Sequence, residues 1–296
     1  MIEASIKSVQ CISPAGLHTM SYKEWGAPDN PNVLVCVHGV TRVADDFDSL
    51  ARAMASDYRV ICPDVVGRGR SGWLANPQFY RVPQYVSDMV TLLARVLDYG
   101  ERQTVDWFGT SMGGLIGLGL ASLSGSPVRK LVLNDVGPVI EAAALQRIGS
   151  YVGQSGFWAT LDEAADASWA LSQGFGPHSR EQWLALTAPQ LKPATQDGRD
   201  GFAARCDPAI AVPFRAVTPE LAKAGEALLW QSYDGLQCTT LLLRGADSDL
   251  LSLATAQAMT QRGPRAQLHQ FAGVGHAPTL VHADQIEVLR RFLLSP

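Results

Sequence analysis

The chain has 296 residues, with 24 Lys and Arg against 28 Asp and Glu, so its formal net charge is -4. Apolar residues make up 47% of the chain and charged residues 18%, a balance that is typical of a folded protein and excludes a disordered one. The mild acidity argues against nucleic acid as a partner, because phosphate binding needs a basic stripe. No apolar run approaches the ~18 residues that a membrane span requires.

The start of the sequence and its cysteines bear on the cellular compartment in which we expect the protein. No charged segment followed by an apolar one opens the sequence, so we expect no secretory signal. The five cysteines are scattered, odd in number and without a C-x-x-C pair, which argues against a disulfide scaffold and a metal site. We therefore expect a cytosolic protein without a metal. The sequence leaves the oligomeric state open, and a homodimer is one expectation.

Short apolar runs recur along the chain and predict the strands of a sheet. Two β-rich segments, residues 6–11 and 18–25, flank a Ser-Pro-Ala-Gly turn and predict a hairpin. Residues 32–37 form a continuous apolar run, which is typical of a central parallel strand covered on both faces. Further strands are predicted at residues 58–62, 104–108, 130–133, 240–243 and 268–271.

Segments of helical periodicity lie between these runs. Residues 45–55 place four apolar side chains on one face, those of Phe47, Leu50, Ala51 and Met54. Residues 83–97 begin with proline, which suits a first helical turn. Their predicted buried face consists of Val86, Met89, Val90, Leu93 and Leu97. Strands alternating with helices predict an α/β protein with a mostly parallel sheet.

The alternation stops between about residues 137 and 235. This stretch is rich in Ala and Trp, with helical pieces expected at residues 140–152 and 161–173, and no strand pattern returns before residues 238–241. We interpret residues 138–235 as a helical cap. It is inserted into a core that consists of residues 1–137 and 236–296.

The pentapeptide Gly-Thr-Ser-Met-Gly at residues 109–113 follows a predicted strand and precedes an apolar helix. A G-x-S-x-G match is weak by itself, but its place in a strand-to-helix turn strengthens it. Glycine two residues to either side lets the serine adopt a strained backbone conformation and expose its hydroxyl. No lysine follows, as it would in a phosphate-binding loop. Ser111 is therefore the candidate nucleophile.

A serine hydroxyl needs an adjacent base, and the base needs an acid to orient it. Among six histidines, His276 is the one in a Gly-rich loop after a predicted strand, a position that reaches the carboxyl end of the sheet. Asp135 follows one predicted strand, and Asp247 and Asp249 follow the next. All three acids preserve the chain order Ser, acid, His, and the residues alone leave the choice between them open.

Together these motifs resemble the α/β-hydrolase fold family over nearly the whole chain. His38-Gly39-Val40 is similar to the family's loop after the third strand, residues 64–71 to its D-x-x-G-x-G-x-S segment, and residues 275–278 to its histidine loop. The resemblance implies an α/β-hydrolase fold with a helical cap. It also ranks the acids, because relatives with R-G-x-x-S-D-L-L use the Asp of the Ser-Asp pair: Asp249 first, Asp135 second, Asp247 third.

The same resemblance implies an oxyanion hole made of the backbone N–H groups of Val40 and Met112, each donor contributing a few kcal/mol. His38 is expected to orient the loop by hydrogen bonds. Serine at the turn excludes the aspartate-nucleophile chemistry of related dehalogenases and epoxide hydrolases. Residues 67–72 match G-x-G-x-x-G, but no helical period follows, so we interpret them as a bracing loop and expect no cofactor.

The cap should exclude water and supply an apolar pocket. Candidate lining residues are Trp158, Phe175, Phe214, Trp230 and Tyr233. Arg42 has two interpretations: it binds a substrate carboxylate, or it pairs with Asp45 or Asp46, which we favour.

The motifs and the resemblance together predict a serine hydrolase of small or medium carboxylic esters. Oligomers of hydroxyacids, such as 3-hydroxybutyrate esters, are one substrate class that similar hydrolases accept. Three alternatives stay open: a hydrolase that cleaves a C–C bond of ring-fission products with the same triad, a non-enzymatic small-molecule receptor on this fold, and an acyltransferase.

Overall fold

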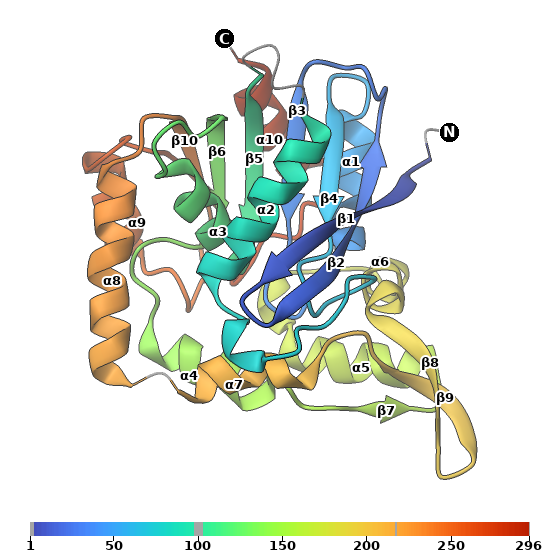
Figure 1. Ribbon diagram of the computed structural model, residues 1–296. Helices are drawn as coiled ribbons and strands as arrows, with labels where there is room; N and C mark the ends of the chain where they lie inside the picture. Colours follow the sequence, from blue (N-terminus) through green and yellow to red (C-terminus); the bar gives the residue numbers. More distant parts are fainter. Residues whose placement is uncertain (1–2, 98–102, 217, 296) are drawn as a thin grey trace.

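Eight strands form a mixed sheet in the computed structural model, which describes residues 3–97, 103–216 and 218–295. Their order is β1-β2-β4-β3-β5-β6-β10-β11, with β1, β2 and β4 paired antiparallel and the remaining neighbours parallel (Figure 1). The strands are β1 (Ser5–Ser13), β2 (Gly16–Trp25), β3 (Val33–Val37), β4 (Arg59–Pro63), β5 (Val105–Thr110), β6 (Val128–Asn134), β10 (Thr239–Gly245) and β11 (Gln267–Phe271). Each strand predicted from the sequence for this sheet is present.

The central strand β3 explains why its sequence is continuously apolar. Val33, Val35 and Val37 pack into the hydrophobic core on one face of the sheet. Leu34 and Cys36, which alternate with them, pack into the core on the other face. Because successive side chains of a strand point to opposite faces, a strand that is covered on both sides must be apolar at every position.

Helices cover both faces of this sheet (Figure 1). They are α1 (Asp48–Met54), α2 (Val82–Val96), α3 (Met112–Ala121), α8 (Pro219–Asp234), α9 (Leu253–Gln261) and α10 (Ala283–Leu294). α3 packs against α2, β5 and α8, whereas α1 contacts α10. The apolar face predicted for the first helical segment is confirmed, since all four of its side chains are buried.

The buried face of α2 differs from the prediction at one position. Met89 and Leu93 are buried as expected, but Val90 is 45% exposed. Tyr85, Met89, Leu92 and Val96 form the buried stripe instead. Val90 follows Met89 by one residue, a rotation of about 100° around the helix axis, which turns its side chain to solvent.

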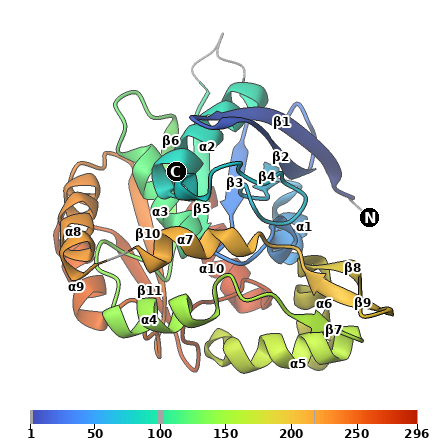
Figure 2. The same ribbon diagram turned by 60° about the horizontal axis from the view of Figure 1, so that its bottom comes forward.

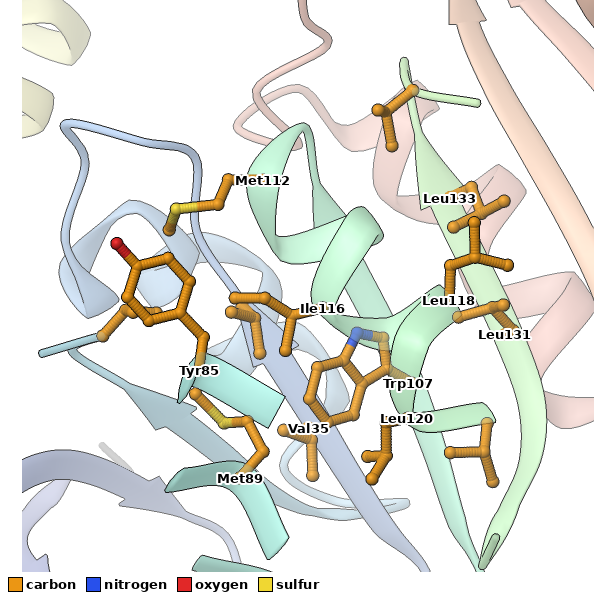
Figure 3. Close-up of a cluster of buried hydrophobic side chains, with 14 of the residues drawn as sticks. Val35, Tyr85, Met89, Trp107, Met112, Ile116, Leu118, Leu120, Leu131 and Leu133 are labelled. Carbon is orange, nitrogen blue, oxygen red and sulfur yellow. The ribbon is translucent and has the colours of Figure 1, made fainter. Parts of the chain in front are cut away.

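Trp107 of β5 is the largest side chain in the core beneath α3 (Figure 3). Figure 3 shows its indole between Ile116 and Leu120 of α3 and Leu131 of β6. The indole Nε1 donates a hydrogen bond of 3.1 Å to the carbonyl of Gly113, in the first turn of α3. This bond and the surrounding apolar contacts fix the start of α3, and therefore the turn before it, to the sheet.

Most of the chain between β6 and β10 forms a second layer over one end of the sheet (Figures 1 and 2). Its helices at that end are α4 (Ala142–Tyr151), α5 (Leu161–Leu171), α6 (Arg180–Thr187) and α7 (Ala211–Arg215). It also holds a three-stranded antiparallel sheet of β7 (Phe157–Trp158), β9 (Arg199–Ala204) and β8 (Leu191–Gln196). The prediction of a stretch without strands is therefore wrong.

A sequence signal for the β8–β9 hairpin was present. Gln196 pairs with Arg199, so Asp197 and Gly198 form a two-residue turn, and both have positive φ, 50° and 72°. Asp-Gly is a preferred sequence for such a turn, because its twist matches that of the two strands. The proline-rich composition around it hid this signal.

Helix α8 falls inside the predicted cap limits, 138–235, but packs on the core. It contacts α3, and the hydroxyl of Tyr233, which is fully buried, donates a 2.6 Å hydrogen bond to the carbonyl of Met259 in α9. Figure 1 shows α8 beside α9, away from α5 and α6. Among the described residues, no helix combines the length and apolarity needed to cross a bilayer.

Replacing Gly117 of α3 by Ala should destabilise the protein, although Ala favours helix. A Cβ at Gly117 would lie 2.3 Å from Nε1 of Trp107, and overpacking of this kind costs about 1–3 kcal/mol. Gly225→Ala in α8 is the matched control, because its Cβ meets no atom within 4 Å; it should stabilise the fold by about 0.5–1 kcal/mol. Free energies of unfolding in urea test the pair, and equal signs for both substitutions would contradict the packing argument.

Candidate active site

Ser111 stands between β5 and α3 with a strained backbone, φ 52° and ψ -116°. Two glycines make this turn possible. A Cβ on Gly109 would lie 2.2 Å from the carbonyl oxygen of Gly113, and a Cβ on Gly113 would lie 2.0 Å from that of Val37. Because the turn is this tight, the serine hydroxyl projects beyond the carboxyl end of β5.

A chain of short hydrogen bonds starts at this hydroxyl. Ser111 Oγ lies 3.0 Å from Nε2 of His276, and Nδ1 of His276 lies 2.7 Å from Oδ2 of Asp135. A carboxylate only accepts hydrogen bonds, so Nδ1 carries the proton and Nε2 is left free to accept from the serine. This is the tautomer that a general base for Ser111 requires.

Two hydrogen-bond donors besides His276 hold the carboxylate of Asp135 in place. Asp135 is fully buried directly after β6, with φ 56°. The backbone N–H of Gly245 donates to Oδ1 at 2.9 Å, and the hydroxyl of Ser248 donates to Oδ2 at 2.5 Å. These donors satisfy a carboxylate that is otherwise costly to bury, and they leave it one direction in which to meet His276.

The prediction that Asp249 is the carboxylate in contact with His276 is wrong. Asp249 is exposed and forms a bidentate ion pair with Arg147, at 2.9 and 2.8 Å. Asp247 is also exposed. Ser248, between these two acids, is the residue of this loop that reaches Asp135. The side-chain directions in a turn decide this, and the sequence spacing does not contain them.

His276 reaches Asp135 because its loop passes close over β10. A Cβ on Gly245, at the end of β10, would lie 2.1 Å from the carbonyl oxygen of Gly275. On the other side, the N–H of Gly275 donates to the carbonyl of Gly174, in the layer above the sheet, at 2.6 Å. The histidine loop is thus packed between the core and the overlying layer.

The two residues proposed as oxyanion donors, Val40 and Met112, lie beside Ser111, and both contact the side chain of Arg68. Met112 begins α3, where the first N–H groups have no acceptor within the helix, and Val40 lines the same cavities as Ser111. Arg68, fully buried, donates to the carbonyl of Val40 at 2.8 Å and contacts the Met112 sulfur at 3.5 Å. The bracing role expected for residues 67–72 agrees with these contacts.

His38 orients the loop after β3, as expected. Its Nε2 accepts from the N–H of Val65 at 2.9 Å, so Nδ1 carries the proton and donates to the carbonyl of Gly39 at 2.7 Å. Complete burial lowers the pKa of His38 to about 3, and the charges of Arg68 and Arg42 act in the same direction. His38 is therefore neutral at neutral pH, and because its Nε2 already accepts the Val65 N–H in a fully buried position, it is not available as a second base.

Two cavities meet at Ser111. One, of about 210 Å³, lies between the sheet and the overlying layer, with His276, Arg42, Arg147, Tyr151, Trp158 and Phe175 among its lining residues. The other, of about 240 Å³, is more apolar and is lined by Met112, Leu115, Tyr85, Leu145 and Phe214, among others. An ester bond placed at Ser111 would have room on both of its sides.

The residues predicted to line a pocket divide into three groups. Trp158, Phe175 and Arg42 line the first cavity, and Phe214 lines the second. Arg42 is at the same time paired with Asp46, at 2.7 Å to each carboxylate oxygen, as the favoured interpretation expected. The predictions for Trp230 and Tyr233 are wrong, because neither residue lines either cavity. Both lie on α8, where the indole of Trp230 packs against Tyr233 and against the guanidinium of Arg262.

One buried group in the described part of the chain has residue types that can ligate a metal. Its members are Cys11, His18 and Asp88, whose ligand atoms lie within 4.8 Å of one another. Nε2 of His18 already lies 3.0 Å from Oδ2 of Asp88, and Gln84 donates to Oδ1 at 2.8 Å. Both carboxylate oxygens have protein partners, so we interpret the group as a buried pair between His18 of β2 and Asp88 of α2.

Comparisons with known proteins agree with this fold. The sequence profile of the alpha/beta hydrolase family matches residues 34–289. The chain is 53% identical over 286 residues to the 3-hydroxybutyrate-oligomer hydrolase of Cupriavidus necator, and the match covers 96% of each protein. It is 27% identical over 240 residues to the 2-hydroxymuconate semialdehyde hydrolase of a Pseudomonas strain, with 80% of this chain and 76% of that protein covered.

Solved structures also match the fold of this chain. The crystal structure of an alpha/beta hydrolase from Novosphingobium aromaticivorans matches with a TM-score of 0.84 and 33% sequence identity, over 99% of both chains. E-2-(acetamidomethylene)succinate hydrolase matches with a TM-score of 0.80 at 19% identity, over 98% of this chain and 100% of that one, which is a likeness of fold.

The buried neutral His38 should make stability fall in acid. Its pKa in the folded protein, about 3, lies below the ordinary value of 6.5, so the unfolded chain binds a proton that the folded one refuses. The contribution is complete above about pH 6.5 and is lost as the pH falls towards 3, by up to about 1.4 kcal/mol per pH unit.

Unfolding in urea between about pH 7.5 and 4.5 tests this expectation with His38→Asn, which removes the titrating group. Wild type should lose more stability than the variant over that range, so the difference between the two should shrink in acid. A difference that stays constant with pH would show that His38 titrates normally.

Proposed function

The chain belongs to the alpha/beta hydrolase family, as its motifs predicted, and we propose that it hydrolyses the ester bonds of 3-hydroxybutyrate oligomers with Ser111 as nucleophile. The observation that carries this proposal is the hydrogen-bonded chain from Ser111 through His276 to Asp135, which opens on a cavity. The relative from Cupriavidus necator, at 53% identity, supports the substrate class.

In the proposed first half-reaction, Oγ of Ser111 attacks the ester carbonyl carbon while Nε2 of His276 takes the hydroxyl proton. The N–H groups of Val40 and Met112 donate to the oxygen that becomes negative. The tetrahedral intermediate then collapses: the C–O bond to the alcohol breaks, His276 returns the proton to that oxygen, and the acyl group stays on Ser111.

In the second half-reaction, water attacks the acyl-enzyme and gives a proton to His276, and the bond to Ser111 Oγ breaks with return of that proton. Asp135 takes no proton in either step. Its buried charge keeps His276 in the tautomer with Nδ1 protonated and stabilises the imidazolium that forms twice in each cycle. The donors from Gly245 and Ser248 support this role, because they hold the carboxylate in the orientation in which it meets Nδ1 of His276.

The layer over the sheet acts, in this proposal, as a cap that limits water around the acyl-enzyme. Its contact with the histidine loop through Gly174 supports that role. We assign it residues 138 to about 216, rather than to 235, because α8 packs on the core. The cytosolic location and the homodimer stay predictions.

The second candidate function is hydrolysis of a C–C bond in a ring-fission product, favoured by the likeness to 2-hydroxymuconate semialdehyde hydrolase. The lower identity, 27% against 53%, places it behind ester hydrolysis. Direct assay of both substrate classes decides between them.

Ser111→Ala should lower kcat for 4-nitrophenyl butyrate by on the order of 10⁴ to 10⁶, because it removes the hydroxyl that lies against Nε2 of His276 and that carries the acyl group in this proposal. Asp135→Asn should lower it by on the order of 10⁴, since an amide favours the wrong tautomer of His276. Asp249→Asn is the matched control, an isosteric change at the acid that faces solvent, and should keep kcat within an order of magnitude. The reverse ranking of the two aspartates would overturn the role of Asp135.

The linear dimer and trimer of 3-hydroxybutyrate should be cleaved to monomer with kcat/KM of about 10⁴ M⁻¹ s⁻¹ or more, the lower end for an enzyme on its own substrate. Monomer release can be followed by chromatography, with Ser111→Ala as the blank. Parallel assays with a coloured dienolate ring-fission product measure the second candidate. Faster turnover of the dienolate would move the assignment to C–C hydrolysis.

A further inference from the structure

The first cavity beside Ser111 is lined by two guanidinium groups, those of Arg42 and Arg147. Both act on the hydroxyl of Tyr151 in the cavity wall: burial raises the pKa of Tyr151, the charge of Arg147 lowers it, the charge of Asp249 opposes Arg147 by raising it, and the charge of Arg42 lowers it. The one carboxylate among the lining residues, that of Asp207, accepts hydrogen bonds from Tyr80 and from the N–H of Ala209. Each of the two arginines is paired with a carboxylate that does not line the cavity, Arg42 with Asp46 and Arg147 with Asp249, so an arginine released from its partner would favour a ligand with a negative charge.

Arg42 is committed to a structural pair. Its guanidinium donates to both oxygens of Asp46 at 2.7 Å, and the side chains of the two residues are 10% and 16% exposed. It also lies over the ring of Phe175, at 5.5 Å. If Arg42 turned to a ligand, the carboxylate of Asp46 would be left buried without a counter-ion, which is strongly unfavourable.

Arg147 is not held in a buried ion pair. Its pair with Asp249 is bidentate, but the two side chains are 40% and 52% exposed. An exposed ion pair contributes little, because water solvates each charge well when the pair separates. Arg147 can therefore exchange the carboxylate of Asp249 for another one, and Asp249 then returns to water at small cost.

We propose that Arg147 is the carboxylate-binding residue of this enzyme: it releases Asp249 and takes the free terminal carboxylate of the hydroxyacid oligomer in a bidentate ion pair. The inference rests on the proposed function, in which the leaving alcohol carries that carboxylate. Arg147 thus holds the leaving-group side of the ester in the first cavity. Asp249 occupies the arginine in the absence of substrate.

The test compares 3-hydroxybutyrate dimer with its methyl ester, which keeps the scissile bond but lacks the charge. Arg147→Gln should lower the ratio of kcat/KM for the acid to that for the methyl ester by roughly 10- to 100-fold, mainly through KM. Arg147→Lys should recover part of the ratio, because lysine keeps the charge but cannot form the planar bidentate pair. Asp249→Asn should not lower the ratio, since it removes only the competing carboxylate.

Arg180→Gln is the matched control. Arg180 forms similarly exposed ion pairs with Asp162 and Asp166 and does not line the cavity, so both substrates should be cleaved as by wild type. A fall of equal size for acid and methyl ester in Arg147→Gln would overturn the inference and leave the proposed function standing. Failure of wild type to cleave either compound would instead overturn the proposed function itself.

Discussion

The close approach of Gly113 to the carbonyl of Val37 is the constraint on which the rest of the site depends. At this point the first turn of α3 lies directly against the end of β3, with no room for a side chain. The indole Nε1 of Trp107 fixes the same turn by donating a hydrogen bond to the carbonyl of Gly113. As a result Ser111 is kept in a backbone conformation that costs energy, and the stable core around Trp107 compensates for that cost.

Every other part of the site is placed relative to this turn. The end of β6, the neighbouring strand, brings Asp135 beside it, and the loop after β11 brings His276 across the end of β10. Ser111 and Asp135 directly follow two paired strands, so strand spacing sets their separation, whereas His276 is placed by a loop that is packed against the end of β10. Buried charges then stay only where donors satisfy them, as Gly245 and Ser248 do for Asp135.

The layer over the sheet has a different physical character. It has a small core of its own around Trp183 and Leu186, but other apolar side chains of the layer, such as Ile148, Val152 and Ile210, pack into the core on one face of the sheet. An ion pair between Arg147 and Asp249 also joins the two layers at the edge of the cavity. An exposed pair in that position can hold the layers together and can also exchange partners, which a buried pair such as that of Arg42 and Asp46 cannot do.

The sequence by itself determined the sheet strands, and it singled out Ser111 and His276, which the structure brings together, because each depends on local patterns: continuous apolar runs, glycine spacing and chain order. It left three aspartates open and ranked Asp249 first, whereas strand adjacency and side-chain direction bring Asp135 into contact with His276. It also missed the β8–β9 hairpin and misplaced Trp230, whose indole faces Arg262. Only the tertiary structure decides such contacts, since they join residues that no spacing in the chain relates.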